Sequence, residues 1–330
     1  MTSTIAVKPR PLPKGVYCPV VSVYQATDRQ EVDLDSSYKY FSYLISGGVD
    51  ALVLAGSTAE AVLLSPTERQ DLLRIARKAA LDLGFANYPL VAGISGQSTI
   101  ESVRLAEEAR EAGADFALLL PPSYWAKAVT KDVILSFYRD VAEQSPIPVV
   151  IYNFPAVCNG IDLNSDVLSE LAKHPNIVGV KLTCGNAGKV TRLTQEYTHA
   201  QFGVFAGQSD WLVPCLSGGG HGCVTGIGNV FPKSVCRLYN LWQEGKVQEA
   251  IKLQGLVAQA EKACKEGIAA IKFGAGHFAG PLAGVNDPRV FYPRKPYKPA
   301  GKEMQTWIVD VMKHLVEVEN SLPTLGLLSL

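Results

Sequence analysis

The sequence of 330 residues has no excess of either charge: 31 Lys and Arg balance 31 Asp and Glu, so the formal net charge is zero. This balance gives no electrostatic basis for binding nucleic acid or an anionic membrane. No apolar run is long enough to span a bilayer, and the first residues have no apolar core typical of a signal peptide. We therefore expect a cytoplasmic protein that acts on a small molecule rather than on nucleic acid or membranes.

The N-terminal segment MTSTIAVKPRPLPKG also lacks acidic residues, while it contains Lys8, Arg10 and Lys14. That composition leaves a transit peptide open as an alternative, although the prolines disfavour an amphipathic targeting helix. We interpret residues 1–14 as a short extended arm.

Metal and disulfide motifs are missing as well. The seven cysteines are odd in number, scattered and without a CxxC pair, which favours a reduced intracellular protein over a disulfide framework or zinc site. The five histidines show neither HxH nor HExxH spacing, so a metal-dependent mechanism is not expected. Cys184 lies close to Lys181 in the sequence and could line a site there, whereas the other cysteines are expected in the core.

Two further motifs are absent. No GxSxG elbow is present for serine nucleophile chemistry. The first apolar strand is followed by Tyr24-Gln25-Ala26-Thr27-Asp28 and not by the glycine-rich phosphate turn of a dinucleotide-binding sheet. A doubly wound sheet is therefore the second choice of fold.

Short apolar runs that alternate with amphipathic stretches are the main pattern that is present. Runs that are apolar throughout are typical of parallel strands covered on both faces, and eight strand–helix units in about 250 residues match a (β/α)8 barrel. Ser65-Pro66-Thr67-Glu68 has the residue types of a helix start with a capping box. The expected strands are Val16–Val23, Ala51–Leu54, Leu90–Ile94, Phe116–Leu119, Val149–Tyr152, Ile177–Leu182, Phe202–Ala206 and Gly222–Thr225, and among the expected helices are Ser65–Leu81, Thr99–Ala112 and Thr130–Glu143.

Beyond about Phe231 the sequence is mostly helical, with helices expected at Lys246–Lys265 and Gly301–Asn320. We predict an α/β chain in three parts: the arm at residues 1–14, a (β/α)8 TIM barrel at residues 15–245, and a C-terminal helical extension packed on the barrel at residues 246–330.

Lys181 and Tyr152 are the most informative residues, because each closes an apolar strand. Burying an unpaired ammonium group is unfavourable, and the neutral amine that burial promotes can attack a carbonyl carbon. A tyrosine hydroxyl at a neighbouring strand end could then transfer protons to and from the adduct. The pair suggests imine chemistry on a small keto acid.

Other polar groups follow the strand ends, where barrel enzymes place their sites. After the second strand, Gly56-Ser57-Thr58 offers amides and hydroxyls that could hold a carboxylate, although an ordinary helix cap is an equal alternative. Further residues of this kind are Tyr124, Gly207, Ser209, Asp210 and the segment Gly226–Asn229. The glycine-rich run before His221 precedes its strand, so we expect it at the opposite end of the barrel as a tight turn.

The strings GSTAEAVLLSPTER, PPSYW, IYNFP and GVKLT, in this order and at this spacing, resemble the dihydrodipicolinate synthase / N-acetylneuraminate lyase superfamily over about Gly15 to Lys265. The members are pyruvate-dependent class I aldolases on a (β/α)8 barrel. The resemblance implies a Schiff base at Lys181, an acid/base role for Tyr152, and binding of the pyruvyl carboxylate by Ser57 and Thr58.

The resemblance also implies that Ser57 links Tyr152 to Tyr124 in a proton relay. Because the residue matching Tyr124 comes from a neighbouring subunit, a homodimer or homotetramer follows. Val224 matches a position whose backbone contacts the keto acid, Gly207 and Ser209 are candidate substrate contacts, and neither a metal nor an organic cofactor is implied.

The sequence departs from the lysine-pathway members of this superfamily after IYNFP. Those synthases carry an arginine there, but this chain continues Ala156-Val157-Cys158-Asn159-Gly160. The pattern is closer to 4-hydroxy-2-oxoglutarate aldolases and fungal 2-keto-3-deoxy-sugar-acid aldolases. We therefore expect cleavage of a 4-hydroxy-2-keto acid to pyruvate and an aldehyde; the alternatives are a dehydratase or hydratase-aldolase, dihydrodipicolinate synthase, and a non-catalytic barrel scaffold.

Overall fold

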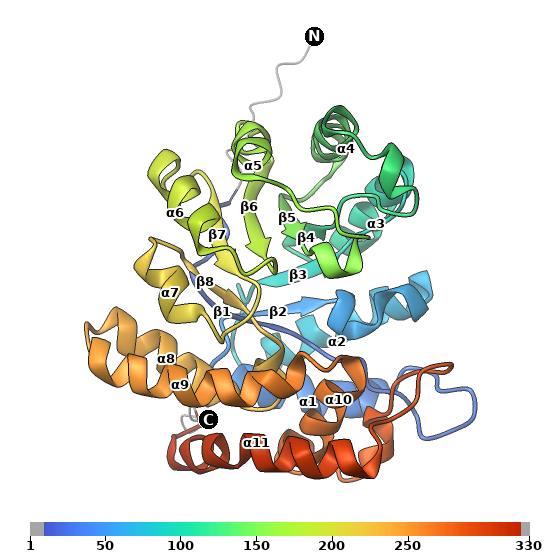
Figure 1. Cartoon of the computed structure of the whole chain (residues 1–330). Coiled ribbons are helices and arrows are strands. Elements are labelled where there is room, and N and C mark those ends of the chain that lie inside the picture. The colour runs from blue at the N-terminus through green and yellow to red at the C-terminus, as the bar shows by residue number, and fades with distance from the viewer. Residues whose placement is uncertain (1–9, 325–330) are drawn as a thin grey trace.

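Eight parallel strands close into a barrel in the order β1 to β8, surrounded by helices (Figure 1). This arrangement is the predicted (β/α)8 barrel, and it is seen in a computed structural model that describes residues 10–324. The strands are β1 (Gly15–Pro19), β2 (Ala51–Leu54), β3 (Leu90–Gly93), β4 (Phe116–Leu119), β5 (Val149–Asn153), β6 (Ile177–Leu182), β7 (Gly203–Ala206) and β8 (Gly222–Val224).

Helices connect the strands and extend beyond the last one. They are α1 (Leu34–Ser46), α2 (Pro66–Asp82), α3 (Thr99–Glu111), α4 (Lys131–Gln144), α5 (Ser165–Ala172), α6 (Ala187–Glu196), α7 (Leu212–Ser217), α8 (Pro232–Gln243), α9 (Val247–Cys264), α10 (Ile268–Gly274) and α11 (Lys302–Ser321). The predicted start of α2 is confirmed: the Ser65 side chain accepts from the Glu68 amide, and the Glu68 carboxylate accepts from the Ser65 amide.

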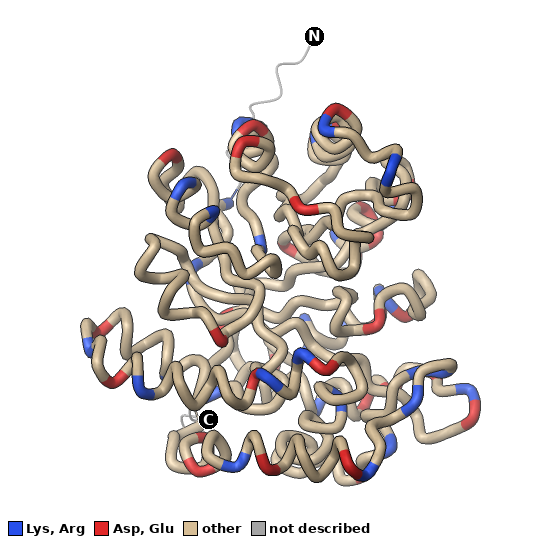
Figure 2. Tube along the Cα trace, viewed as in Figure 1, with Lys and Arg blue, Asp and Glu red and all other residues tan. Residues whose placement is uncertain are grey.

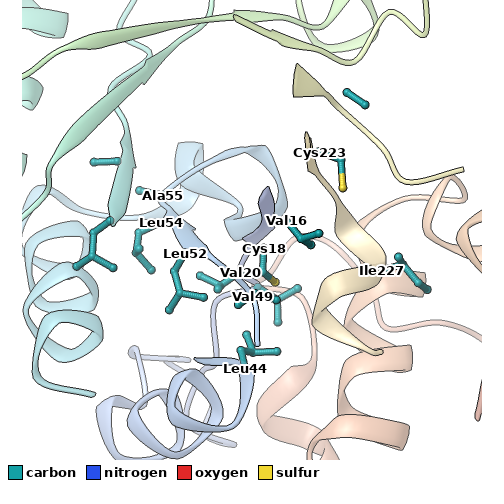
Figure 3. Close-up of a cluster of buried hydrophobic side chains, with 14 of the residues drawn as sticks. Val16, Cys18, Val20, Leu44, Val49, Leu52, Leu54, Ala55, Cys223 and Ile227 are labelled. Carbon is teal, nitrogen blue, oxygen red and sulfur yellow. The ribbon is translucent and has the colours of Figure 1, made fainter. Parts of the chain in front are cut away.

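The strands separate two hydrophobic layers. Outward-facing side chains such as Val16 of β1 and Leu52 of β2 pack against the surrounding helices, including Leu44 of α1 (Figure 3). Inward-facing side chains such as Tyr17 and Phe205 fill the barrel, with ring centroids 5.2 Å apart. This alternation explains the continuously apolar strands, since both faces of each strand are covered.

The first strand is shorter than the predicted Val16–Val23. Pro19 has no amide hydrogen to donate, and the amide of Val21 donates to the side chain of Asn229 at 3.0 Å instead of to a neighbouring strand. The Val20 amide makes one more bond to β2, to the Val53 carbonyl at 3.1 Å, and the chain then leaves the barrel wall.

The end of the barrel at which the strands begin is closed by the described part of the predicted arm. Leu12 is buried inside the barrel, its carbonyl lies 2.7 Å from Nε2 of His199, and Pro13 accepts a 2.6 Å hydrogen bond from the Tyr17 hydroxyl. Residues 1–9, the remainder of the arm, lie outside the described residues.

Beyond β8, helix α8 covers the barrel, and α9, α10 and α11 pack together against it (Figure 1). Charges of both signs are interleaved along the outer helices (Figure 2). None of the helices in residues 10–324 is long and apolar enough to cross a membrane. The division into arm, barrel and extension remains a prediction about the chain's organisation.

Candidate active site

Lys181 points into the barrel because of an irregularity in β6. The register with β5 shifts by one residue: Val149 pairs with Ile177, but Val150 pairs with Gly179. Val178 is thus an extra residue on β6, and such β-bulges reorient the side chains that follow them. Without the bulge, strict alternation from the outward-facing Ile177 would send Lys181 outward as well.

Glycine is required at this bulge. A Cβ atom on Gly179 would lie 2.6 Å from the carbonyl oxygen of Gly203 on β7, too close for any other residue. The close approach of the two backbones lets β6 stay paired with both of its neighbours while carrying the extra residue.

Lys181 differs from the other buried lysines that the structure describes. Lys189 and Lys272 each form an ion pair, with Asp162 and Glu60 respectively. The Lys181 ammonium group instead lies 4.1 Å from the centroid of the Tyr152 ring, and the side chain is 3% exposed. An amine placed against an aromatic ring, rather than held by a carboxylate, remains available to a carbonyl substrate.

Tyr152 occupies the adjacent position on β5, where its Cα is the register partner of Lys181. Its hydroxyl lies 3.0 Å from the Ser57 hydroxyl, and either group could be the donor. Its ring stacks on Phe154 with centroids 5.7 Å apart. The ring is therefore held beside Lys181, and its hydroxyl has a hydrogen-bonded partner for proton transfer.

Ser57 and Thr58 begin a 3-10 turn, Ser57–Ala59, directly after β2. The first amides of a helical turn have no partner within it, so they suit an anion. The turn is closed by Glu60, whose amide donates to the Ser57 carbonyl at 3.1 Å and whose φ of 55° lies in the left-handed region. Hydroxyls and amides are thus presented together at the barrel mouth.

A cavity of about 560 Å³ joins these groups, within the usual size of small-molecule sites. Of the predicted site residues, it is lined by Lys181, Tyr152, Ser57, Thr58 and Gly207. The barrel and the strand-end loops supply one part of the wall, while α9, α10 and the segment between them supply the other.

Two predicted substrate contacts lie elsewhere. Val224 faces the barrel interior, where it lines a small void together with the stem of Lys181. Ser209 is fully buried, with its amide 2.9 Å from a carboxylate oxygen of Glu261 and its hydroxyl bonded to the same oxygen. Substrate binding by these two residues remains a prediction, and direct contact with the Ser209 side chain would require this hydrogen bond to open.

Glu261 is a part of the cavity wall that the sequence did not indicate. It lies on α9, is 1% exposed, and accepts hydrogen bonds from Ser209 and from the Thr225 hydroxyl at 2.8 Å. Burial raises its pKa. The carboxyl group ties the ends of β7 and β8 to the extension.

Lys265 follows α9 and also lines the cavity. Its ammonium group pairs with Asp210 and is 47% exposed at the mouth. Cys264 beside it lines the cavity as well, whereas Cys184 contacts the Lys189 ammonium at 3.7 Å and is absent from the lining. Burial raises the pKa of the Cys264 thiol, which disfavours the nucleophilic thiolate.

Thr183 is another residue that sequence reasoning did not single out. It lines the cavity two positions after Lys181, and its buried hydroxyl has no hydrogen-bond partner among the described residues. The two-residue period of a strand could have indicated it, since Thr183 shares the face of Lys181.

Tyr124 is 76% exposed, and its ring packs edge-on against Trp125 with centroids 5.3 Å apart. A second cavity, of about 280 Å³, lies between Tyr152 and Ser57 on one side and Gln97 and Ser123 on the other. Within one chain Tyr124 is not in the wall of either cavity.

The glycine-rich run before His221 lies at the opposite end of the barrel, as predicted. His221 Nδ1 accepts a hydrogen bond from the Val204 amide at 2.9 Å, and its ring lies 4.7 Å from that of His199. Burial, with contributions from His199 and Lys14, lowers the pKa of His221 to about 4. The neutral ring serves the structure of the barrel.

A barrel with a buried lysine, a hydrogen-bonded tyrosine–serine pair and a turn with unpaired first amides at one mouth has the arrangement expected of an aldolase that acts on keto acids. The sequence profile of the Dihydrodipicolinate synthetase family matches residues 12–315, and the chain belongs to this family. The resemblance found in the sequence is thereby confirmed, and its extent is larger than predicted.

Individual relatives are similar over nearly their whole length. A protein of Coccidioides immitis, provisionally named a mitochondrial 4-hydroxy-2-oxoglutarate aldolase, is 44% identical over 95% of this chain and 99% of its own. The L-threo-3-deoxy-hexylosonate aldolase of Aspergillus niger is 33% identical over 96% and 99%. A crystal structure of a dihydrodipicolinate synthase family protein from Coccidioides immitis superposes with a TM-score of 0.88 at 40% identity, covering 96% of this chain and 100% of that one.

The expected cytoplasmic location is wrong in the light of these relatives, because the 44% identical protein is named as mitochondrial. The absence of acidic residues from the N-terminal segment, and the three basic residues Lys8, Arg10 and Lys14 within residues 1–15, were the signal in favour of an organelle.

Proposed function

We propose that this protein is a class I aldolase that cleaves a 4-hydroxy-2-keto acid to pyruvate and an aldehyde through a Schiff base at Lys181. The observation that carries the proposal is the buried Lys181 amine beside Tyr152, whose hydroxyl lies 3.0 Å from that of Ser57 at the start of the Ser57–Ala59 turn. The names of the relatives at 44% and 33% identity support it.

The residues divide the reaction between them. The Lys181 amine adds to the C2 carbonyl and water leaves, giving a protonated imine. The C4 hydroxyl proton passes to the Tyr152–Ser57 pair, the C3–C4 bond breaks, and its electrons move into the imine to form an enamine while the aldehyde leaves. Protonation of C3 and hydrolysis by water then release pyruvate and the free lysine.

A dicarboxylate such as 4-hydroxy-2-oxoglutarate is the favoured substrate. The Ser57–Thr58 turn would hold the carboxylate next to the keto group. The Lys265 ammonium group lines the same cavity and pairs with Asp210 in the structure, and it would exchange this partner for a distal carboxylate of the substrate. The segment after Phe154 offers only apolar side chains, Ala156 and Val157, to the cavity. Lys265 therefore takes the role for which other family members use an arginine after the tyrosine strand.

A six-carbon 3-deoxy sugar acid is the second candidate. The cavity of about 560 Å³ is larger than pyruvate needs, and the Aspergillus niger relative is named for such a substrate. The buried Thr183 hydroxyl, which has no partner among the described residues, could meet a substrate hydroxyl. The two candidates differ in the charge of the distal end.

The active unit is proposed to contain at least two copies of the chain. The exposed side chains of Val62, Tyr124 and Trp125, at 88%, 76% and 76%, are large apolar groups that a second copy would cover. The second cavity, beside Ser57 and Tyr152, is where Tyr124 of that copy would complete the proton relay. The compartment we propose, by similarity to the Coccidioides immitis relative, is the mitochondrion.

Reduction with borohydride in the presence of pyruvate tests the imine. We expect an adduct on the peptide containing Lys181, no adduct in Lys181→Ala, and an adduct with turnover slowed about 10²–10⁴-fold in Tyr152→Phe. Both variants should remain folded by circular dichroism. A folded wild-type protein that gives no adduct would exclude the class I mechanism, and wild-type turnover in Tyr152→Phe would exclude the proton-transfer role.

A further inference from the structure

A buried ion pair lies behind the carboxylate-binding turn, outside the groups that contact substrate in the proposed mechanism. Lys272 of α10 is 0% exposed, and its ammonium group donates to Oε2 of Glu60 at 2.5 Å. The other carboxylate oxygen of Glu60 accepts from the Arg294 amide at 2.8 Å. Both oxygens of Glu60 are therefore held by residues of the C-terminal part of the chain.

An aromatic ring completes the arrangement. The Lys272 ammonium group lies 4.2 Å from the centroid of the Tyr24 ring, and the Arg294 guanidinium carbon lies 4.4 Å from it. Arg294 also donates to Glu68 of α2 at 2.5 Å and to the Leu63 carbonyl at 2.7 Å. The pair thus connects the segment after β1, the loop after β2 and the extension.

Because Glu60 adjoins the Ser57–Ala59 turn, the contacts that fix Glu60 also fix the turn. It directly follows Ala59, and its amide donates to the Ser57 carbonyl, so its position sets the end of the Ser57–Ala59 turn. The Ala59 carbonyl in turn accepts from the Ser22 hydroxyl at 2.7 Å. The turn is fixed from behind, which leaves its amides and hydroxyls directed at the cavity.

Stability alone does not explain the pair. Burial lowers the pKa of Lys272 from its ordinary 10.5 to about 8. A lysine whose pKa is lower in the folded chain than in the unfolded chain destabilises the folded state while the lysine is protonated. This destabilisation is fully present below pH 8 and is lost as the pH rises from about 8 to above 10.5. At neutral pH the lysine is charged in a buried site, and replacing such a pair by apolar residues is often neutral or stabilising.

We propose that Lys272 is a positioning residue, which acts through Glu60 to hold Ser57 and Thr58 where they bind the carboxylate of the keto acid. The C-terminal extension would then contribute to pyruvate binding, although only α9, α10 and the segment between them line the cavity. This inference rests on the proposed function, since it needs a carboxylate bound at the turn.

The test compares Lys272→Met with the double variant Lys272→Met/Glu60→Gln. Lys272→Met leaves a buried carboxylate without its partner and should lower stability, whereas the double variant removes both charges and should recover much of it. If Lys272 positions the Ser57–Ala59 turn through Glu60, both variants should need about 10-fold more pyruvate for half-maximal borohydride trapping at Lys181. The limiting adduct yield should stay unchanged.

Arg77→Met is the matched control. It removes a partly buried ion pair with Asp115, which precedes β4 at the far end of the barrel, and should lower stability without changing the pyruvate requirement. If the double variant traps pyruvate at the wild-type concentration, the positioning role is excluded, even where Lys272→Met alone fails to fold. Absence of any adduct in the wild-type protein would instead overturn the proposed function.

Discussion

At the scale of single residues, chemistry depends on where a side chain lies rather than on its type. Three buried lysines occur within the described residues, in two kinds of environment: Lys189 and Lys272 each pair with a carboxylate, whereas Lys181 lies against an aromatic ring without one. Of the three, Lys181 is the one that lines the cavity of about 560 Å³ without a carboxylate partner. The same reasoning separates Lys265, at the cavity mouth, from Lys262, which lies one turn earlier on α9 with its ammonium group 5.8 Å from the Trp307 ring.

Replacing Lys265 with methionine should change substrate preference. The loss of a charge-assisted hydrogen bond to a distal carboxylate corresponds to about 10- to 100-fold in kcat/KM for 4-hydroxy-2-oxoglutarate. A 3-deoxy sugar acid with an uncharged distal end should be cleaved as before. Steady-state kinetics with both substrates measures the ratio.

Lys262→Met is the control for this change, because it removes a neighbouring lysine that is not in the cavity lining, and the ratio should then stay at the wild-type value. An equal effect of Lys265→Met on both substrates would show that Lys265 does not recognise a distal carboxylate.

At the scale of elements, the ends of the barrel have separate tasks. The mouth carries the polar turn and the lysine, whereas the opposite end is closed by Leu12, Tyr17 and the His199–His221 pair. His221 connects β7 and the start of β8 through its hydrogen bond from the Val204 amide. Because this bond needs a neutral ring, the stability of this end should depend on pH.

The pH dependence follows from the lowered pKa of His221. Between pH 6.5 and about 4 the unfolded chain binds a proton at this histidine and the folded chain does not. Stability is therefore complete above pH 6.5 and is lost as the pH falls toward 4, by up to about 3 kcal/mol at 1.4 kcal/mol per pKa unit. In His221→Asn the amide oxygen can still accept from Val204, so this part of the pH dependence should disappear.

Denaturant unfolding at pH 7 and pH 4.5, at one protein concentration, measures the difference. His314→Asn, on the exposed side of α11, should retain the wild-type dependence. A dependence in His221→Asn as steep as in the wild type would assign it to other groups.

The bounds of the strands could be predicted from the sequence better than the directions of their side chains. The strands β2, β4 and β6 have their predicted bounds, because runs that are apolar on both faces are distinctive. The orientation of Lys181 could not be predicted from alternation, because a bulge at Val178 changes the count. That irregularity becomes visible only when β5 lies beside β6.

The sequence also did not predict that α9 and α10 form a wall of the cavity, and the reason differs from that for Lys181. Glu261 and Lys265 lie about 80 residues after Lys181, on and after a helix whose sequence reads as an ordinary amphipathic surface. Their role depends on how the extension packs over the mouth, and no local pattern encodes that packing. The predicted contact of Ser209 with substrate also depends on this packing, because in the structure its hydroxyl is bonded to Glu261 of α9.

At the scale of the whole molecule, one chain lacks the third member of the proposed proton relay. Tyr152 and Ser57 are joined, but Tyr124 is exposed beside Trp125 and lines neither cavity at the site. Large exposed aromatic side chains next to a cavity are typical of an interface. In a two-fold symmetric dimer, each chain would give its Tyr124 to the other and receive one in return.

Mixed dimers test this exchange. Co-expression of a Lys181→Ala chain and a Tyr124→Phe chain under two different tags allows the mixed dimer to be purified. If Tyr124 acts across the interface, one of its two sites has both Lys181 and a native Tyr124, and the other has neither, so the mixed dimer should reach about half of the wild-type activity.

The parent Lys181→Ala protein should be inactive and the parent Tyr124→Phe protein slowed. If Tyr124 acts within its own chain, the only site that keeps Lys181 also carries the Tyr124→Phe substitution. The mixed dimer then cannot exceed half the activity of the Tyr124→Phe parent, and recovery beyond that value is what an intersubunit relay requires.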